Sequence, residues 1–144
     1  MFDGVTAVIF LTAISEYDQV LLEDGKTNRL LESRDLFIEI LKNVAFQNSD
    51  VVLFLNKKDV FEEKMKSGSF NNYITLYKGK PDDAGAAILY IKSNIFEKAF
   101  NAYGSGKTFY CHVTQATDTT NAEKLFSYIY DIVFERLIGD LPIS

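Results

Sequence analysis

An uninterrupted apolar run, Val51 to Leu55, is followed at once by the polar tetrad Asn56-Lys57-Lys58-Asp59. An unbroken run of this length is typical of a strand buried on both faces, as in a parallel sheet. Open α/β sheets bind their ligands just beyond the carboxyl ends of their strands. The run therefore predicts a central parallel strand, and the tetrad is a candidate binding site.

The tetrad carries groups that can recognise guanine, which has acceptors at N7 and O6 and N–H donors on its Watson–Crick edge. The Asp59 carboxylate can accept two of these donors at once, a pair that adenine does not offer. The amide of Asn56 can donate toward N7 and connect neighbouring loops. The stem of Lys57 can lie over the purine, and Lys58 is expected to be solvated. A polar turn after a buried strand is the alternative, because so short a motif also arises by chance.

Composition limits the class of protein. With 144 residues, 47% of them apolar, the chain is long enough for one domain with a core and too apolar for disorder. A net charge of -5 argues against general affinity for nucleic acid or anionic membranes. The single cysteine, Cys111, has no internal partner, which favours a reducing compartment.

No targeting or membrane-spanning segment is predicted. The longest apolar stretch, Val5 to Ile14, is short for a membrane span and contains two threonines. The N-terminal residues Met1 to Gly4 have neither the basic region of a signal peptide nor a glycine at position 2. We therefore expect a soluble cytosolic domain without a transmembrane segment.

Val5 to Leu11 is expected to be a second buried strand, and Phe109 to Val113 a third strand. Apolar residues at helical spacing predict helices from Thr27 to Val44 and from Pro81 to about Phe100. Because connections of over thirty residues separate the strands, they predict parallel β-helix-β units. The fold class is α/β, with three parallel strands and flanking helices.

The remaining segments predict less regular structure. We expect Ser15–Gly25 to be a solvated acidic loop and not a metal site, and Phe61–Lys66 to be a short charged helix. Phe70–Lys80 is expected to be an irregular connection. The capping box Thr120-x-x-Glu123 is expected to open a final helix. His112 lies in the middle of a strand and is expected to be a core or half-buried histidine and not a catalytic one. We expect no catalytic residue and no metal ligand.

Gly104-Ser105-Gly106-Lys107-Thr108 has the ending of a phosphate-binding loop but not its context. The full pattern needs a glycine five residues before Gly106, where this chain has Asn101. A phosphate loop also follows a strand and opens a helix, whereas these glycines follow a predicted helix and precede a strand. We therefore interpret the segment as a helix stop with a tight turn.

With both candidate loops placed, the chain resembles the C-terminal part of a heterotrimeric G-protein alpha subunit, from the fourth strand of its Ras-like domain to its end. The matching segments are residues 2–10, Ser15-Glu16-Tyr17-Asp18, Phe54-Leu55-Asn56-Lys57-Lys58-Asp59 and Tyr110-Cys111-His112-Val113-Thr114-Gln115-Ala116-Thr117-Asp118-Thr119. The resemblance implies that residues 1–144 are part of a three-layer Ras-like P-loop NTPase fold. An unrelated flavodoxin-like domain is an alternative, against which the second loop argues.

The resemblance implies specific roles for several residues. Asn56, Lys57 and Asp59 would hold the base of GTP or GDP, the backbone N–H of Ala116 would donate to guanine O6, and Thr114 would shape that loop. At the C-terminus, Ile138 and Ile143 match aliphatic positions of the receptor-binding end, and Leu141 stands where some members have a modifiable Cys. Pro142 and Ser144 depart from that pattern, and Gln115 replaces a frequent Cys.

The resemblance also implies partners: a beta-gamma dimer, a G protein-coupled receptor and effector enzymes, at the inner face of the plasma membrane. The segment from Thr27 to Val44 would neighbour the effector and beta-gamma surface. The parts that bind phosphate and Mg²⁺ and hydrolyse GTP in that family have no counterpart in this sequence, so we expect no hydrolysis by the chain alone. The alternative is a non-catalytic module that binds receptor or beta-gamma in competition with full-length alpha subunits.

The strand from Val5 to Leu11 would lie at an apolar sheet edge, because its family neighbour carries the phosphate loop. Such an edge invites pairing with another chain. Either the missing half is supplied by another chain, or this sequence is a fragment of a longer protein, with a partial gene model favoured.

Overall fold

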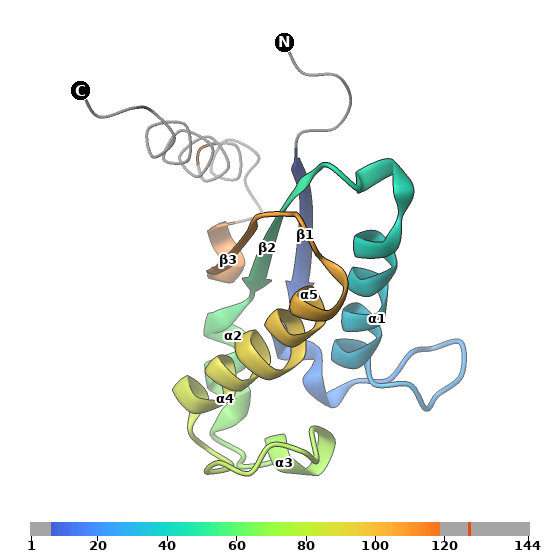
Figure 1. Ribbon diagram of the computed structural model, residues 1–144. Helices are drawn as coiled ribbons and strands as arrows, with labels where there is room; N and C mark the ends of the chain where they lie inside the picture. The colour runs from blue at the N-terminus through green and yellow to red at the C-terminus, as the bar shows by residue number, and fades with distance from the viewer. Residues whose placement is uncertain (1–6, 119–126, 128–144) are drawn as a thin grey trace, which may run out of the picture.

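A parallel three-stranded sheet forms the centre of the computed structural model, which describes residues 7–118 and residue 127. Its strands are β1 (Ala7–Ala13), β2 (Asp50–Asn56) and β3 (Phe109–Val113), in the order β1-β2-β3 (Figure 1). The uncharged segment Val51 to Leu55 lies in β2 and is buried along its whole length. The expected α/β fold with three parallel strands is confirmed, whereas the final helix expected from Thr120 lies outside the described residues.

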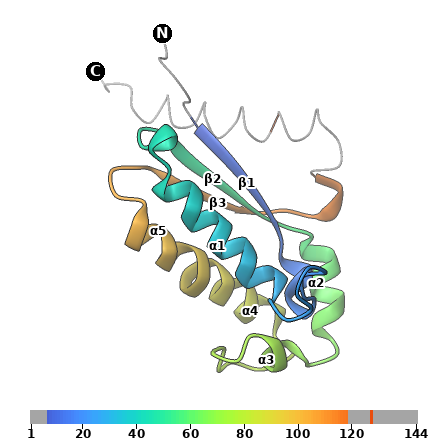
Figure 2. The ribbon, with the colours of Figure 1, turned by 90° about the vertical axis from the view of Figure 1, so that its right-hand side faces the viewer.

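The helices connect and cover these strands. In chain order they are the 3-10 helix η1 (Ile14–Asp18), α1 (Arg29–Lys42), η2 (Val44–Phe46), α2 (Lys58–Met65), α3 (Phe70–Tyr73), α4 (Ala84–Tyr90), the π-helix η3 (Ile91–Glu97), α5 (Lys98–Tyr103) and η4 (Ala116–Asp118). Figure 2 shows α1 and the run α4–η3–α5 side by side on one face of the sheet. The two long predicted helices are therefore present.

Phe37 of α1 connects both helices to the sheet. Its ring centroid lies 5.5 Å from that of Phe10 in β1, 5.4 Å from that of Phe96 in η3 and 6.0 Å from that of Phe109 in β3. Phe37 and Phe96 have no exposed surface. Tilted and edge-to-face ring pairs add to the stabilisation that burial provides, so this cluster fixes the helix layer against the strands.

Two local expectations are wrong. The start of the acidic segment is the helix η1, in which Tyr17 is fully buried against the rings of Phe61 and Phe70. Both acidic side chains of η1 form ion pairs, Asp18 with Lys64 at 2.7 Å and Glu16 with Arg29 at 3.2 Å. In addition, α2 begins at Lys58, three residues before the expected start.

The sequence predicted that β1 is a buried strand, but in the structure side chains on one of its faces are exposed. Ile9 is 38% exposed and Leu11 46% exposed, whereas Phe10 between them packs into the helix-covered core. Successive side chains of a strand point to opposite faces, so Ile9 and Leu11 share the face away from α1. The strand ends at Ala13, two residues later than expected, and lies at an edge of the described sheet.

The interpretation of the glycine-rich segment is confirmed. Helix α5 ends at Tyr103, and the N–H of Gly104 donates to the carbonyl of Phe100 at 2.7 Å. A side chain at position 104 would meet the Phe100 ring at 2.5 Å, and Gly106 has a φ of +80°. The segment ends a helix and leads into β3, the reverse of the order in a phosphate loop.

Candidate functional site

The two candidate loops lie side by side because β2 and β3 end together. Leu55 of β2 is opposite Val113 of β3 in the parallel register. Beyond that point, the N–H of Thr114 donates to the carbonyl of Leu55 at 2.9 Å, and the N–H of Lys58 donates to the carbonyl of Thr114 at 3.0 Å. The backbones of the two loops are thus joined directly at the carboxyl edge of the sheet.

A buried polar pair reinforces this junction. The Thr114 hydroxyl donates to Asn56 Oδ1 at 2.8 Å, and the two residues are only 2% and 8% exposed. A buried acceptor needs such a partner, because an unpaired one retains the full cost of its lost hydration. Asn56 therefore connects the two loops through its side-chain oxygen, to which Thr114 donates.

Lys57 turns the chain from β2 into α2. Its φ of 67° and ψ of 41° put it in the left-handed region, and it is the only non-glycine residue with positive φ in the described part of the chain. This conformation costs an ordinary residue on the order of 1–2 kcal/mol. The strain lets α2 begin at Lys58, which places Asp59 in its first turn, where the helix dipole favours a carboxylate.

Asp59 and Ala116 lie in direct contact. Asp59 Oδ1 accepts a hydrogen bond from the backbone N–H of Ala116 at 2.9 Å. This bond is the main reason why the pKa of the Asp59 carboxyl is below its usual value. The Asp59 carboxylate and the Ala116 N–H, which were both expected to contact guanine, are therefore hydrogen-bonded to each other in this structure. A base can enter only if the exposed Asp59 side chain turns away from Ala116.

Asp118 supports the second loop and was not among the candidate residues. Its Oδ2 accepts from the N–H of Gln115 at 2.8 Å, which closes the turn that presents Ala116. Aspartate is frequent in turns because its side chain can accept from nearby backbone N–H groups, so the sequence did contain a clue. The expected receptor-binding residues Ile138, Leu141 and Ile143 lie outside the described residues.

The chemistry of the loops fits the edge of a guanine base. An N–H donor suits the O6 acceptor, and a carboxylate suits the N–H donors beside it. Within residues 7–118, no group of three His, Cys, Asp or Glu side chains is arranged as a metal site. Cys111, on β3, is largely buried, and this burial raises the pKa of its thiol to about 11.

No helix within the described residues is both long enough and apolar enough to cross a bilayer.

Known proteins match nearly the whole chain. A model of the G-protein alpha subunit family matches residues 1–133. The guanine nucleotide-binding protein G(o) subunit alpha of Caenorhabditis elegans is 45% identical over 132 residues, which cover 92% of this chain and 36% of that protein. The alpha-7 subunit of Dictyostelium discoideum is 40% identical over 139 residues, covering 96% and 35%.

A vertebrate relative has a similar identity and coverage. The alpha-12 subunit of Rattus norvegicus is 38% identical over 143 residues, which cover 99% of this chain and 37% of that protein. The chain thus spans about a third of the length of the curated relatives it matches. On the family match and these identities, the chain belongs to the G-protein alpha subunit family.

Proposed function

We propose that this chain is the base-recognising part of a guanine-nucleotide-binding alpha subunit that transduces receptor signals to effectors. The observation that carries the proposal is the contact between Asp59 and Ala116, which come from loops 57 residues apart. The names of the relatives, which describe guanine nucleotide-binding proteins, support it.

Each candidate residue has a distinct part in this proposal. The Asp59 carboxylate would accept from the guanine N–H groups, and the freed N–H of Ala116 would donate to O6. Lys57 would lie over the base with its methylene stem. Asn56 and Thr114 would hold the two loops at a fixed separation through their buried hydrogen bond.

The expected affinity is low. Four or five hydrogen bonds to the base contribute about 0.5–1.5 kcal/mol each, somewhat more for those to Asp59. Association costs about 4 kcal/mol or more, and the contact between Asp59 and Ala116 must also be given up. We therefore expect selectivity for guanine, no tight binding of GTP and no GTP hydrolysis by this chain alone.

Nuclear magnetic resonance titration of the isotope-labelled chain with GMP and AMP tests the proposal, because it detects weak binding residue by residue. We expect GMP to shift the amide signals of Ala116 and Lys58, and AMP to leave them in place. Asp59→Asn should weaken GMP binding roughly tenfold, since hydrogen bonds to a charged group contribute about 1.5–3 kcal/mol.

Asp82→Asn is the matched control, because it makes the same change in charge at an exposed position away from both loops. It should leave the GMP affinity unchanged. Equal shifts with GMP and AMP would refute base recognition, and submicromolar GTP affinity in titration calorimetry would refute the expected weakness.

The partners expected for a whole alpha subunit are part of the same proposal: a beta-gamma dimer, a receptor and effector enzymes at the inner face of the plasma membrane. The segment with Ile138, Leu141 and Ile143 would face the receptor. A receptor pull-down with the triple alanine variant tests this role, and unchanged capture would contradict it.

The second candidate function is a non-catalytic module that competes with full-length alpha subunits. In this role the chain would bind receptor or beta-gamma without hydrolysing GTP. For such a module, receptor capture should not change when GTP is added. A GTP-dependent change in capture would favour the nucleotide-regulated transducer.

A further inference from the structure

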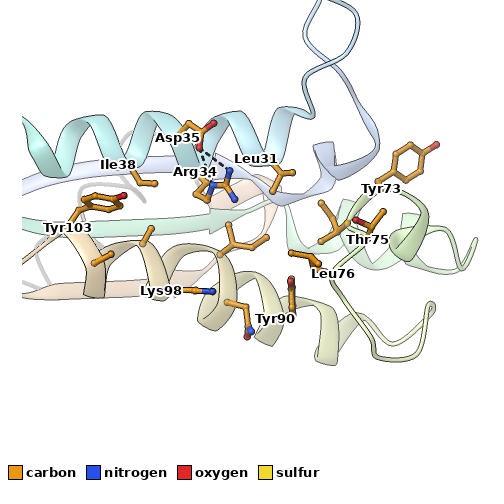
Figure 3. A pocket seen from close by; sticks show the side chains of 15 residues that line it. Leu31, Arg34, Asp35, Ile38, Tyr73, Thr75, Leu76, Tyr90, Lys98 and Tyr103 are labelled. Atoms are coloured by element: carbon orange, nitrogen blue, oxygen red, sulfur yellow. Dashed lines mark hydrogen bonds and ion pairs between the residues drawn. The ribbon is translucent and has the colours of Figure 1, made fainter.

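A cavity of about 470 Å³ lies between α1 and the run α4–η3–α5, on the helix-covered side of the sheet (Figure 3). Its apolar lining includes Leu31 and Ile38 of α1 and Ile95 of η3. Cavities that bind small molecules have volumes of about 300–1,000 Å³ and mostly apolar walls with a few polar groups. The size and lining of this cavity therefore suit a small organic ligand.

Exposed apolar side chains surround the opening. Tyr73 and Leu76, from the segment around α3, and Tyr103, at the end of α5, are exposed although they are large and apolar. Figure 3 shows Tyr103 at one end of the groove and Tyr73 at the other. Exposed apolar side chains gathered around a cavity are typical of binding sites.

Two cationic side chains from opposite walls line the same cavity. Lys98 projects from α5 and Arg34 from α1. Lys98 is exposed, and no carboxylate within residues 7–118 forms an ion pair with it. Arg34 forms an ion pair with Asp35, a carboxylate that also lines the cavity, through its Nε at 3.1 Å and its Nη2 at 3.0 Å. Within residues 7–118, the Arg34 Nη1 group makes no hydrogen bond, so its two N–H donors can still bind a ligand. These donors lie at the groove in a chain whose net charge is -5.

We propose that this groove binds a small amphiphilic organic anion. Its apolar body lies against the side chains of Leu31, Ile38 and Ile95, and its anionic group is held by Lys98 and by the free donors of Arg34. Because Asp35 offsets the charge of Arg34, Lys98 supplies the net positive charge that favours an anion over a neutral molecule of the same shape, and Arg34 adds N–H donors. The site is separate from the proposed base site, because none of Asn56, Lys57, Asp59, Thr114 and Ala116 lines it.

The π-helical segment η3 belongs to this groove wall, to which it contributes Asn94 and Ile95. Short π-helical segments within α-helices are rare and are frequently found at functional sites. Here the segment interrupts the longest helical run of the described chain at the cavity.

Fluorescence titration with anilinonaphthalene sulfonate, an aromatic anion, tests the proposal on the full chain. We expect saturable binding to the unaltered protein. Lys98→Glu should weaken it roughly tenfold or more, because it replaces a charge-assisted contact by repulsion. Ala102→Phe, at an exposed position in the groove wall, should weaken it similarly by filling the space.

Lys92→Glu is the matched control, since Lys92 lies in the same helical run but faces Glu97 and Cys111 instead of the groove. It should leave the affinity within about twofold. Uncharged phenylnaphthylamine should bind the Lys98→Glu variant as well as the unaltered protein. Near-ultraviolet circular dichroism checks that each variant is folded, because the anionic probe also binds loosely packed states.

Three results would overturn the proposal: no saturable binding to the unaltered protein, equal affinity in the Lys98→Glu variant, or equal weakening by Lys92→Glu.

Discussion

Thr114 and Asn56 form a polar pair that water scarcely reaches, at the point where β2 and β3 end. Replacing Thr114 with Val keeps the shape of the side chain but removes the hydroxyl, which leaves Asn56 Oδ1 buried without that donor. We expect the free energy of unfolding to fall by about 1–3 kcal/mol, measured by urea denaturation.

Thr108→Val serves as the control for this prediction, because it removes a hydroxyl at an exposed position. It should change the free energy of unfolding by no more than about 0.5 kcal/mol. Equal stability of the Thr114→Val variant and the unaltered protein would show that the pair does not stabilise the junction.

The contact between Asp59 and Ala116 should depend on pH. The hydrogen bond from Ala116 lowers the pKa of the Asp59 carboxyl below the ordinary value of 3.8. A lowered pKa in the folded state means that the contribution to stability is fully present above pH 3.8 and is lost as the pH falls through the lowered pKa.

The amide resonance of Ala116, followed by nuclear magnetic resonance during acid titration, measures this loss. It should titrate below pH 3.8 in the unaltered protein and lose that transition in Asp59→Asn. A transition that persists in the variant would assign the titration to another carboxyl group.

At the scale of elements, Asn28 anchors the start of α1. Its Oδ1 accepts from the backbone N–H groups of Leu30 and Leu31, at 2.9 and 3.2 Å, and its Nδ2 donates to the carbonyl of Tyr17 at 2.6 Å. Asn28→Ala removes the cap and the bond to the preceding segment, and we expect a loss of about 1–2 kcal/mol in unfolding free energy.

Asn28→Asp separates the two contributions. The carboxylate retains the acceptor for the helix N–H groups but cannot donate to the Tyr17 carbonyl, so its stability in thermal denaturation should lie between those of Asn28→Ala and the unaltered protein. If the Asn28→Ala variant were as stable as the unaltered protein, the cap would contribute nothing to the free energy of unfolding.

The elements also show where local patterns are sufficient. The unbroken run Val51 to Leu55 predicted β2 correctly, because a strand buried on both faces needs apolar residues at every position. The start of α2 was predicted three residues late, since Lys57 adopts a left-handed conformation that lysine does not favour by itself. Backbone strain of this kind persists only where the surrounding structure imposes it.

At the scale of the whole molecule, β1 is exposed at one side of the described sheet. Its sequence from Ala7 to Ala13 has no charged residue and no proline, the usual protection of an edge strand. We expect this chain to self-associate as its concentration rises, and Leu11→Lys to suppress that association. Sedimentation velocity over a concentration series measures the effect.

Leu22→Lys adds the same charge at a leucine that is 96% exposed and lies outside the sheet. It should not change the association. A chain that stays monomeric at every concentration, or equal suppression by Leu22→Lys, would contradict a role for the edge of β1.

The sequence by itself determined the strands and the two long helices, and it singled out the residues proposed for the base site. Local spacing and the order of apolar and polar segments contain this information, because they reflect which face of an element is buried. The turn at Gly104 was likewise interpreted correctly from the order of its neighbours.

Only the tertiary structure decided how these parts meet. Burial of Tyr17 depends on Phe61 and Phe70, which are more than forty residues away, so no local pattern reports it. Exposure of Ile9 depends on the position of β1 at the edge of the described sheet. The bond between Asp59 and Ala116 exists because parallel strands bring their carboxyl ends to one edge, a consequence of the fold that neither loop encodes alone.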